Sequence, residues 1–319
     1  MPWRGAAATA AVYRAFAAEA RGRSPRYEEL AAAVAGDRSV LAFLGTLPAA
    51  KRQPNLLFAA ARYLLGEPAD LAALRMLVSR RRDELTGTVL ARRTQTNEPA
   101  RCATLLPAMA ILPGPLALLE VGASAGLTLL VDRYSYDYAG HRVTGTDPRA
   151  PVLTCQPQGP VPLPGRVPDV AWRAGLDLNP LDVTDADDVG WLECLLWPGE
   201  TGRQERLAAA IEAARRDPPR VYRGDLLTDV PGIASKAPHG ATLVIYHSAV
   251  LAYVEPRERR QFAELTRALG AVWLSNEGPD VLPGIAITER DPGHFVLAEN
   301  GTRAIARTDA HGTWLRWLS

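Results

Sequence analysis

Apolar residues recur at helical spacing through the first third of the chain. Three or four positions separate them, which is the spacing that gives a helix one buried face. Such segments are residues 8–21, 53–66 and 68–84. Ser24 before Pro25 has the form of an N-cap followed by proline at the first helical position, and Gly66 suits a helix C-terminus. The pattern predicts an all-helical N-terminal domain over residues 1–112.

After residue 115 the pattern changes to short apolar runs that alternate with helical stretches. Such runs are typical of buried strands. The predicted strands cover residues 116–121, 172–177, 220–223, 242–246 and 271–275. Three more strand-like pieces follow from residue 294, with Asn300-Gly301 as a hairpin turn. The alternation predicts an α/β domain over residues 115–319, with a mostly parallel sheet covered on both faces and an antiparallel C-terminal hairpin.

One stretch of this second domain does not follow the alternation. Residues at about 139–171 are rich in proline and glycine, so we expect an insertion, a loop or a lid outside the regular layers. Residues 134–138 and 141–144, on either side of Ala139-Gly140, predict a hairpin.

The composition narrows the function classes. The chain has 319 residues, 47% of them hydrophobic, and its formal net charge of +1 gives no general attraction to nucleic acid or an anionic membrane. No apolar run is long enough to cross a bilayer. Cys102, Cys155 and Cys194 are odd in number and far apart, so neither a disulfide framework nor a metal site is expected. We expect a cytoplasmic protein that acts on a small molecule; the sequence does not indicate its oligomeric state.

The candidate chemistry centres on the turn after the first predicted strand. Glu120 ends that strand, and a loop of Gly122, Ala123, Ser124, Ala125 and Gly126 follows. A strand, a glycine turn and a helix start bring backbone N–H groups against a polar ligand, and the acid suits a ligand with hydroxyl or ammonium groups. The spacing does not match a dinucleotide-binding loop. It matches both the G-x-S-x-G elbow of serine hydrolases and, with Ser124 in place of a glycine, a methyltransferase-like glycine loop.

Polar residues also end the other predicted parallel strands. These are Asp177, Asp225, His247-Ser248 and Asn276-Glu277. Ligands of such sheets bind beyond the C-terminal ends of the strands. Asn97, Glu98 and Arg101 form a further polar cluster before the first strand, which either caps a helix or closes the site from the helical side.

The layout of residues 115–319 resembles the class I S-adenosylmethionine-dependent methyltransferases. The resemblance implies a Rossmann-like sheet in which Glu120 and the loop Gly122–Gly126 hold the methionine part of the cofactor. It implies that Asp177, with Leu178, binds the ribose and that Asp225, with Leu226, lies near the adenine. Asp177 lies about 50 residues beyond the turn, where about 20 is usual, so Asp132 or Asp137 is an alternative ribose partner.

The whole chain more closely resembles an uncharacterised bacterial family, the domain of unknown function 2332. Four long segments carry this resemblance: TNEPARC from Thr96, LEVGASAGL from Leu119, GLDLNPLD from Gly175 and YHSAVLAY from Tyr246. The family brings no established activity with it.

The interpretation we favour is a methyltransferase that uses S-adenosylmethionine and a small-molecule acceptor. His247 is the candidate base because its ordinary pKa lies near neutrality; Ser248 lies beside it and Glu277 orients the acceptor. We expect Asn97, Glu98, Arg101 and Tyr253 to contact the substrate.

Two other interpretations remain open. One is a non-catalytic nucleoside-binding or scaffold protein with a methyltransferase-like fold. The other is a serine hydrolase with Ser124 as nucleophile, His294 or His311 as base, and Asp225 or Glu277 as the orienting acid.

Overall fold

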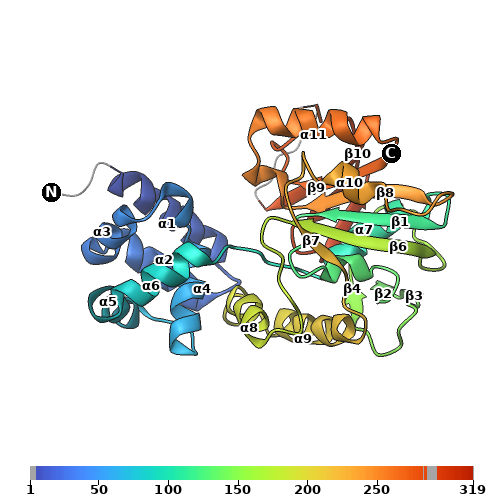
Figure 1. Cartoon of the computed structure of the whole chain (residues 1–319). Helices are drawn as coiled ribbons and strands as arrows, with labels where there is room; N and C mark the ends of the chain where they lie inside the picture. Colours follow the sequence, from blue (N-terminus) through green and yellow to red (C-terminus); the bar gives the residue numbers. More distant parts are fainter. Residues whose placement is uncertain (1–4, 283, 286–292, 319) are drawn as a thin grey trace. The chain divides into compact units, whose positions relative to one another are not determined.

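The structure is a computed structural model that describes residues 5–282, 284–285 and 293–318. Within it the chain forms two compact units (Figure 1). Unit 1 comprises Met1–Thr96 and Asp185–Glu205, and unit 2 comprises Asn97–Thr184 and Arg206–Ser319. The predicted domain bounds at residues 112 and 115 stay a prediction.

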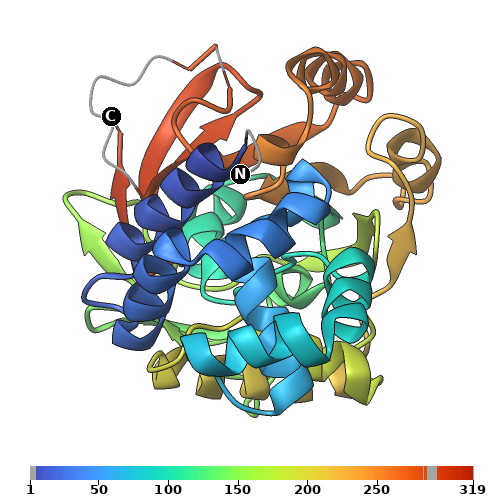
Figure 2. The same cartoon turned by 90° about the vertical axis from the view of Figure 1, so that its left-hand side faces the viewer.

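Unit 1 is helical (Figure 2). Its helices are α1 (Ala6–Ala20), α2 (Pro25–Gly36), α3 (Arg38–Thr46), η1 (Ala49–Lys51), α4 (Pro54–Leu65), α5 (Leu71–Arg80), α6 (Arg82–Ala91), α8 (Ala186–Cys194) and the first part of α9 (Thr201–Arg216). An aromatic cluster of Tyr13, Phe16, Tyr27, Phe58 and Trp197 fills the core. The helical character predicted for the N-terminal region is confirmed.

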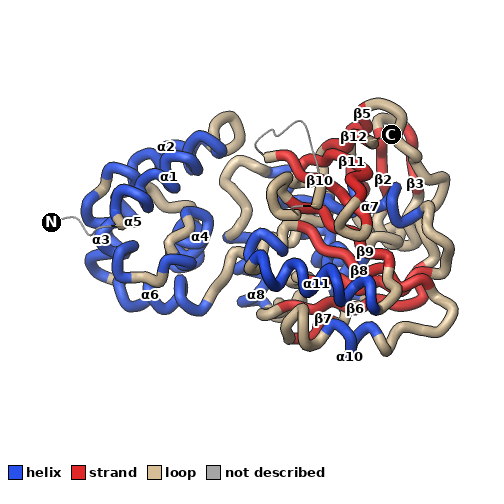
Figure 3. The backbone as a smooth tube through the Cα atoms, turned by 90° about the horizontal axis from the view of Figure 1, so that it is seen from above, coloured by secondary structure: helices blue, strands red, loops and turns tan. Residues whose placement is uncertain are grey.

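Unit 2 is built on a nine-stranded mixed sheet, mostly parallel (Figure 3). The spatial order is β5 (Gln156–Gln158), β12 (Trp314–Trp317), β11 (Arg303–Asp309), β10 (His294–Glu299), β9 (Val272–Glu277), β8 (Thr242–Ser248), β1 (Leu116–Val121), β6 (Val170–Asp177) and β7 (Val221–Arg223). The strands from β9 to β7 are parallel, and β10, β11 and β12 continue the sheet with antiparallel pairs. From β1 the chain first builds outward to β6 and β7, then to β8 and β9 on the other side.

The stretch predicted as an insertion takes part in two sheets. The predicted hairpin is present as β2 (Ser135–Tyr138) and β3 (His141–Val143), and β4 (Val152–Thr154) joins them in a second, three-stranded sheet. Strand β5 pairs in parallel with β12 at the edge of the main sheet. Strand β5 contains Pro157, which an edge strand tolerates because not all of its N–H groups pair. The prediction that this stretch lies outside the regular layers is therefore wrong for β5, whereas β4 belongs to the separate small sheet.

The two faces of the main sheet carry different partners. Tyr246 lies opposite Glu120 in the register of β8 and β1, so both point to one face, and the next residue, His247, points to the other. The first face contacts η2 (Leu127–Leu130) and α7 (Arg101–Ala110), through bonds from Tyr246 and Cys102 to Thr128; we call it the α7 face. The second carries α10 (Val230–Ala234) and α11 (Pro256–Ala268), with Phe262 in its core; we call it the α11 face.

Candidate functional site

The loop after β1 is shaped by close packing. Gly122, Ser124 and Gly126 have positive φ angles of 71°, 52° and 73°. A Cβ atom on Gly122 would lie 2.3 Å from Cγ2 of Val250. On Gly126 it would lie 2.7 Å from the ring of Pro219. These glycines are explained by their neighbours in the fold, so their presence alone does not indicate space for a ligand.

Two predicted site residues hold this loop through its backbone. The Asp177 carboxylate accepts hydrogen bonds from the N–H of Ser124 at 2.8 Å and of Asn179 at 2.8 Å. Asn97 accepts one from the N–H of Leu127 at 2.8 Å, at the start of η2. Both side chains thus satisfy N–H groups that a helix start or a turn would leave open.

Glu120 is a buried carboxyl on the α7 face. It accepts a hydrogen bond from the hydroxyl of Thr128 through Oε1. Its Oε2 atom is buried and has no hydrogen-bond partner among the described residues. Burial raises the pKa of Glu120 to about 8, although Thr128 and the Arg101 guanidinium favour its charged form. The orphaned oxygen is suited to a hydrogen-bond donor or a cation.

His247 and Glu277 form a buried pair on the α11 face. The ring of His247 is completely buried; its Nδ1 lies 2.7 Å from Glu277 Oε1, and its Nε2 accepts a bond from the Trp273 indole at 3.0 Å. The ring is therefore the neutral tautomer that carries its proton on Nδ1. Both nitrogens are occupied by protein groups, so the ring has no lone pair for a substrate proton in this arrangement.

Glu277 also fixes the turn that follows β8. Its Oε1 accepts hydrogen bonds from the N–H groups of Val250 at 2.8 Å and Leu251 at 2.9 Å. Burial acts to raise the pKa of the Glu277 carboxyl, but the bonds from His247, Leu251 and Val250 outweigh it and hold the pKa below its ordinary value. The Oε2 atom is buried without a partner in the described part of the chain. Glu277 therefore positions Val250, the side chain that covers Gly122.

Arg101 and Ser248 lie toward the α7 face at the end of β8. Arg101 donates to the carbonyl of Ser248 at 3.1 Å and to that of Ala310 at 2.9 Å. The Ser248 hydroxyl accepts a bond from the Asn276 amide at 3.2 Å, and Asn276 accepts one from Thr308 at 2.8 Å. The result is a polar row near the C-terminal ends of β8, β9 and β11, with β10 between β9 and β11 in the sheet.

The remaining predicted residues have varied surroundings. Glu98 is buried and forms an ion pair with Arg206 at 2.8 Å. Asp225 caps the turn after β7 by accepting the N–H of Leu227 at 2.8 Å, and Leu226 packs against the α11-face core. Leu178, after β6, is 58% exposed, and Tyr253, in η3 (Leu251–Tyr253), is 70% exposed.

The predicted residues are thus divided between two faces. Glu120 lies on the α7 face with Arg101 beside it, whereas His247 and Glu277 lie on the α11 face. Asp177 and Asp225 end strands on the β6–β7 side. What the residues share is the C-terminal edge of the parallel strands.

For the hydrolase interpretation, Ser124 is buried in a left-handed conformation. His294 lies 3.2 Å from an Arg307 nitrogen and edge-on to Trp314, and the backbone N–H of His311 donates to Asp309. That interpretation stays a prediction.

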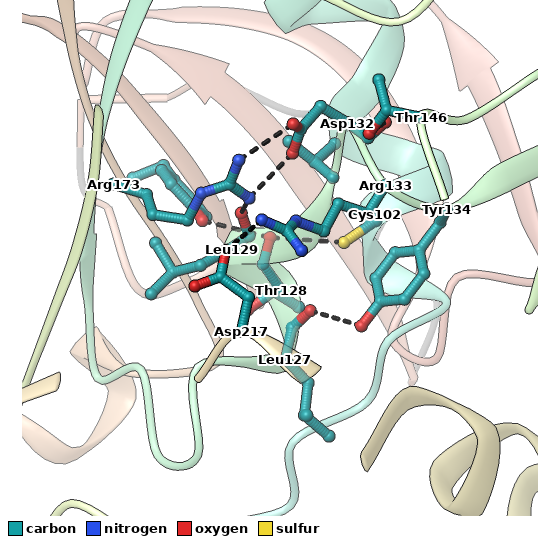
Figure 4. A network of polar contacts seen from close by, with 12 residues as sticks. Cys102, Leu127, Thr128, Leu129, Asp132, Arg133, Tyr134, Thr146, Arg173 and Asp217 are labelled. Carbon is teal, nitrogen blue, oxygen red and sulfur yellow. Dashed lines mark hydrogen bonds and ion pairs between the residues drawn. The ribbon is translucent and has the colours of Figure 1, made fainter. Parts of the chain in front are cut away.

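Sequence reasoning missed two structural partners of the site. The first is Trp273, the hydrogen-bond donor to His247. The second is Arg173, which forms a two-pronged ion pair with Asp132 at 2.8 and 2.9 Å, beside η2 (Figure 4). Of the alternative ribose partners, Asp132 is therefore engaged by Arg173, and Asp137 caps Gly140 in the β2–β3 turn at 2.7 Å. No sequence pattern sets the register of β8 against β9, so the contact between Trp273 and His247 could not be predicted. The contact between Arg173 and Asp132 likewise depends on how β6 packs against the segment after η2.

Metal and membrane features can be stated for the described residues. No cluster of three or more histidine, cysteine, aspartate or glutamate side chains there is arranged to hold a metal ion. Within the same ranges no helix has the length and apolar character needed to cross a membrane.

A comparison of the chain with curated proteins found no match, and neither did a comparison with solved structures. One family model matches residues 10–317, nearly the whole chain. The chain therefore belongs to the family described as uncharacterized protein conserved in bacteria, DUF2332.

Proposed function

We propose that unit 2 binds S-adenosylmethionine at the C-terminal edge of its parallel strands and transfers the methyl group to a small-molecule acceptor. One observation carries the proposal: Glu120 and Asp177 lie at the C-terminal ends of the adjacent parallel strands β1 and β6, beside the point where the chain, after building outward to β7, returns to β8 on the other side of β1. Ligands of open α/β sheets bind beyond the strand ends at this point. We therefore treat the sheet as Rossmann-like, with its ligand site beyond the C-terminal ends of the parallel strands.

The residues at this edge fit such a cofactor in part. The buried, unpartnered Oε2 of Glu120 suits an ammonium group, provided that the ammonium charge displaces the proton that the raised pKa of about 8 keeps on this carboxyl at neutral pH. The carboxylates of Asp177 and Asp225 suit ribose hydroxyls and an adenine edge. The exposed side chains of Leu178 and Tyr253 offer apolar surface after β6 and β8. Gly122 and Gly126 are excluded from this argument because neighbouring side chains fill the space beside them.

When bound, the sulfonium of the cofactor supplies the reactive methyl group. The protein's part is then to orient the cofactor and the acceptor. Asp177 and Asn97 hold the N–H groups of the glycine loop, and the His247–Glu277 pair holds Val250 against Gly122. We assign His247 and Glu277 this positioning role. Ser248, in the polar row of the α7 face, remains the predicted group nearest the acceptor.

A second candidate function has one observation in its favour. Both nitrogens of His247 are occupied, and the ring is completely buried, so the predicted base has no open position. This favours a protein that binds a nucleoside without catalysis. Cofactor binding without turnover in an acceptor screen would support this function over the methyltransferase.

The test is calorimetric titration of the full chain with S-adenosylhomocysteine, using Asp177→Asn and the control Asp169→Asn. Asp169 is exposed and precedes the opposite end of the same strand, β6. We expect Asp177→Asn to weaken binding about tenfold or more, because a charged acceptor is lost, and Asp169→Asn to leave binding unchanged. Equal affinities for the two variants would contradict the assigned site.

A further inference from the structure

A polar pocket of about 550 Å³ opens in unit 2, away from the strand ends discussed above. Its walls come from the segment after η2, the segment after β3 and the end of α9. The lining residues are Asp132, Arg133, Thr146, Asp147, Pro148, Arg149 and Arg216. The volume lies within the range of small-molecule sites, but the pocket is polar and open to solvent, so binding of a ligand would depend on the charged groups of the lining.

The floor of the pocket is rigid. Thr146 donates its backbone N–H to the carbonyl of Asp132 at 2.9 Å, and Asp147 donates to that of Arg133 at 3.3 Å. A Cβ atom on Gly145 would lie 2.2 Å from the carbonyl oxygen of Tyr134, so the two segments approach as closely as only glycine allows. Figure 4 shows Thr146 beside Asp132 at this contact. The backbone from which the charged side chains of the pocket extend is therefore held in place by these contacts.

Two ion pairs cross from this floor to the end of α9. Arg133 pairs with Asp217 (Figure 4), and Arg216 pairs with Asp147, to which it donates from Nε at 3.1 Å. Arg149 adds a third guanidinium, 3.7 Å from the same Asp147 carboxylate and 72% exposed. That long distance leaves Arg149 loosely held.

Positive charge is in excess at the pocket. Asp132 is neutralised by its own partner, Arg173. Among the residues that the structure describes, the three guanidinium groups pair with Asp147 and with the largely exposed Asp217, which leaves one positive charge over. The negative end of the α9 dipole, about half a charge, does not cancel it.

From the rigid floor, the volume and the surplus guanidinium, we propose that this pocket binds the phosphate dianion of a small phosphorylated molecule. Guanidinium groups bind phosphate oxygens in a two-pronged manner, and two or three of them can surround one tetrahedral dianion. Arg149 is free of tight pairing to Asp147 and moves onto the ligand, while Arg133 and Arg216 border it. The site is independent of the proposed cofactor site, and either can fail alone.

The test is calorimetric titration of the full chain with inorganic phosphate and with glycerol 3-phosphate, at constant ionic strength set with sodium chloride. The variants are Arg149→Gln and Arg133→Gln. The control is Arg142→Gln, an arginine 82% exposed in β3 and outside the pocket lining. Thermal unfolding of each variant checks that the fold is kept.

We expect saturable binding that Arg149→Gln and Arg133→Gln each weaken about tenfold, with Arg142→Gln unchanged. Tighter binding of glycerol 3-phosphate than of phosphate identifies a phosphorylated molecule as the ligand, and equal binding identifies free phosphate. Binding that does not saturate, or that all three variants weaken equally, overturns the proposal. The same holds if Arg149→Gln, the most exposed pocket arginine, folds normally and binds like the wild type.

Discussion

Replacing Gly122 by alanine should destabilise the protein both through its left-handed backbone conformation and through a clash with Val250. Two costs add. A left-handed φ of 71° costs a non-glycine residue about 1–2 kcal/mol. The new Cβ atom would also lie 2.3 Å from Val250 Cγ2, whereas carbon atoms make optimal contact at about 3.5–4.0 Å. Overpacking of this kind costs about 1–3 kcal/mol, so Gly122→Ala should lower the free energy of unfolding by about 2–5 kcal/mol.

The steric part is measurable in a double-mutant cycle with Val250→Ala. That substitution removes both clashing γ-carbons and leaves only the Val250 Cβ, 3.2 Å from the new atom. The double variant should therefore be about 1–3 kcal/mol more stable than the sum of the two single changes predicts. Urea unfolding followed by circular dichroism and by tryptophan fluorescence measures the four proteins, and coincident curves check two-state behaviour. Additivity within about 0.5 kcal/mol would refute the packing argument.

Two further predictions concern the buried carboxyls. The pKa of Glu120 is raised to about 8, so the folded protein holds a proton there that the unfolded chain loses above about pH 4.5. Relative to Glu120→Gln, the free energy of unfolding of the wild type should then fall as pH rises from 5 to 8, by up to about 1.4 kcal/mol per pH unit. Denaturation curves at about pH 5, 6.5 and 8 measure this, and a difference between the two proteins that stays constant with pH would contradict it. The pKa of Glu277 is lowered, so its contribution is present above the unfolded value and is lost as pH falls through the folded value. Wild type should lose stability below about pH 4.5 faster than Glu277→Gln, and parallel acid melts of the two proteins would rule out a charged Glu277.

The elements of the fold were largely predictable because local chemistry determines them. Pro25 opens α2 directly after Ser24, as the sequence predicts, although the Ser24 hydroxyl donates to the carbonyl of Pro198 and does not cap the helix. Gly66 ends α4 in a left-handed conformation with φ of 77°. Continuous apolar runs predicted β1 and β8, since strands of a parallel sheet are buried on both faces.

The pairing of distant segments was not predictable in the same way. Strand β5 is three residues long and rich in polar groups, and it pairs only because β12 reaches it from the other end of the chain. The pocket likewise joins Arg133 and Arg216 through Asp217 and Asp147, which are far apart in sequence. No local pattern encodes such contacts.

The arrangement of the candidate site also depends on the pairing of distant strands, which the sequence does not predict. The position of polar residues at strand ends was readable, but the faces to which Glu120 and His247 point were not. They depend on the register of β1 and β8, and a shift of one residue would reverse them. The sequence therefore grouped residues that the structure divides, and it missed Trp273 as the hydrogen-bond partner of His247.

The most direct test of the central proposal is calorimetric titration of the purified wild-type chain with S-adenosylmethionine and S-adenosylhomocysteine, run beside NAD and ATP. We predict micromolar binding confined to the first two ligands. Such a result would support a cofactor site in unit 2 and would justify a screen of small-molecule acceptors. Absence of binding to S-adenosylmethionine and S-adenosylhomocysteine, or equal binding of all four ligands, would contradict it.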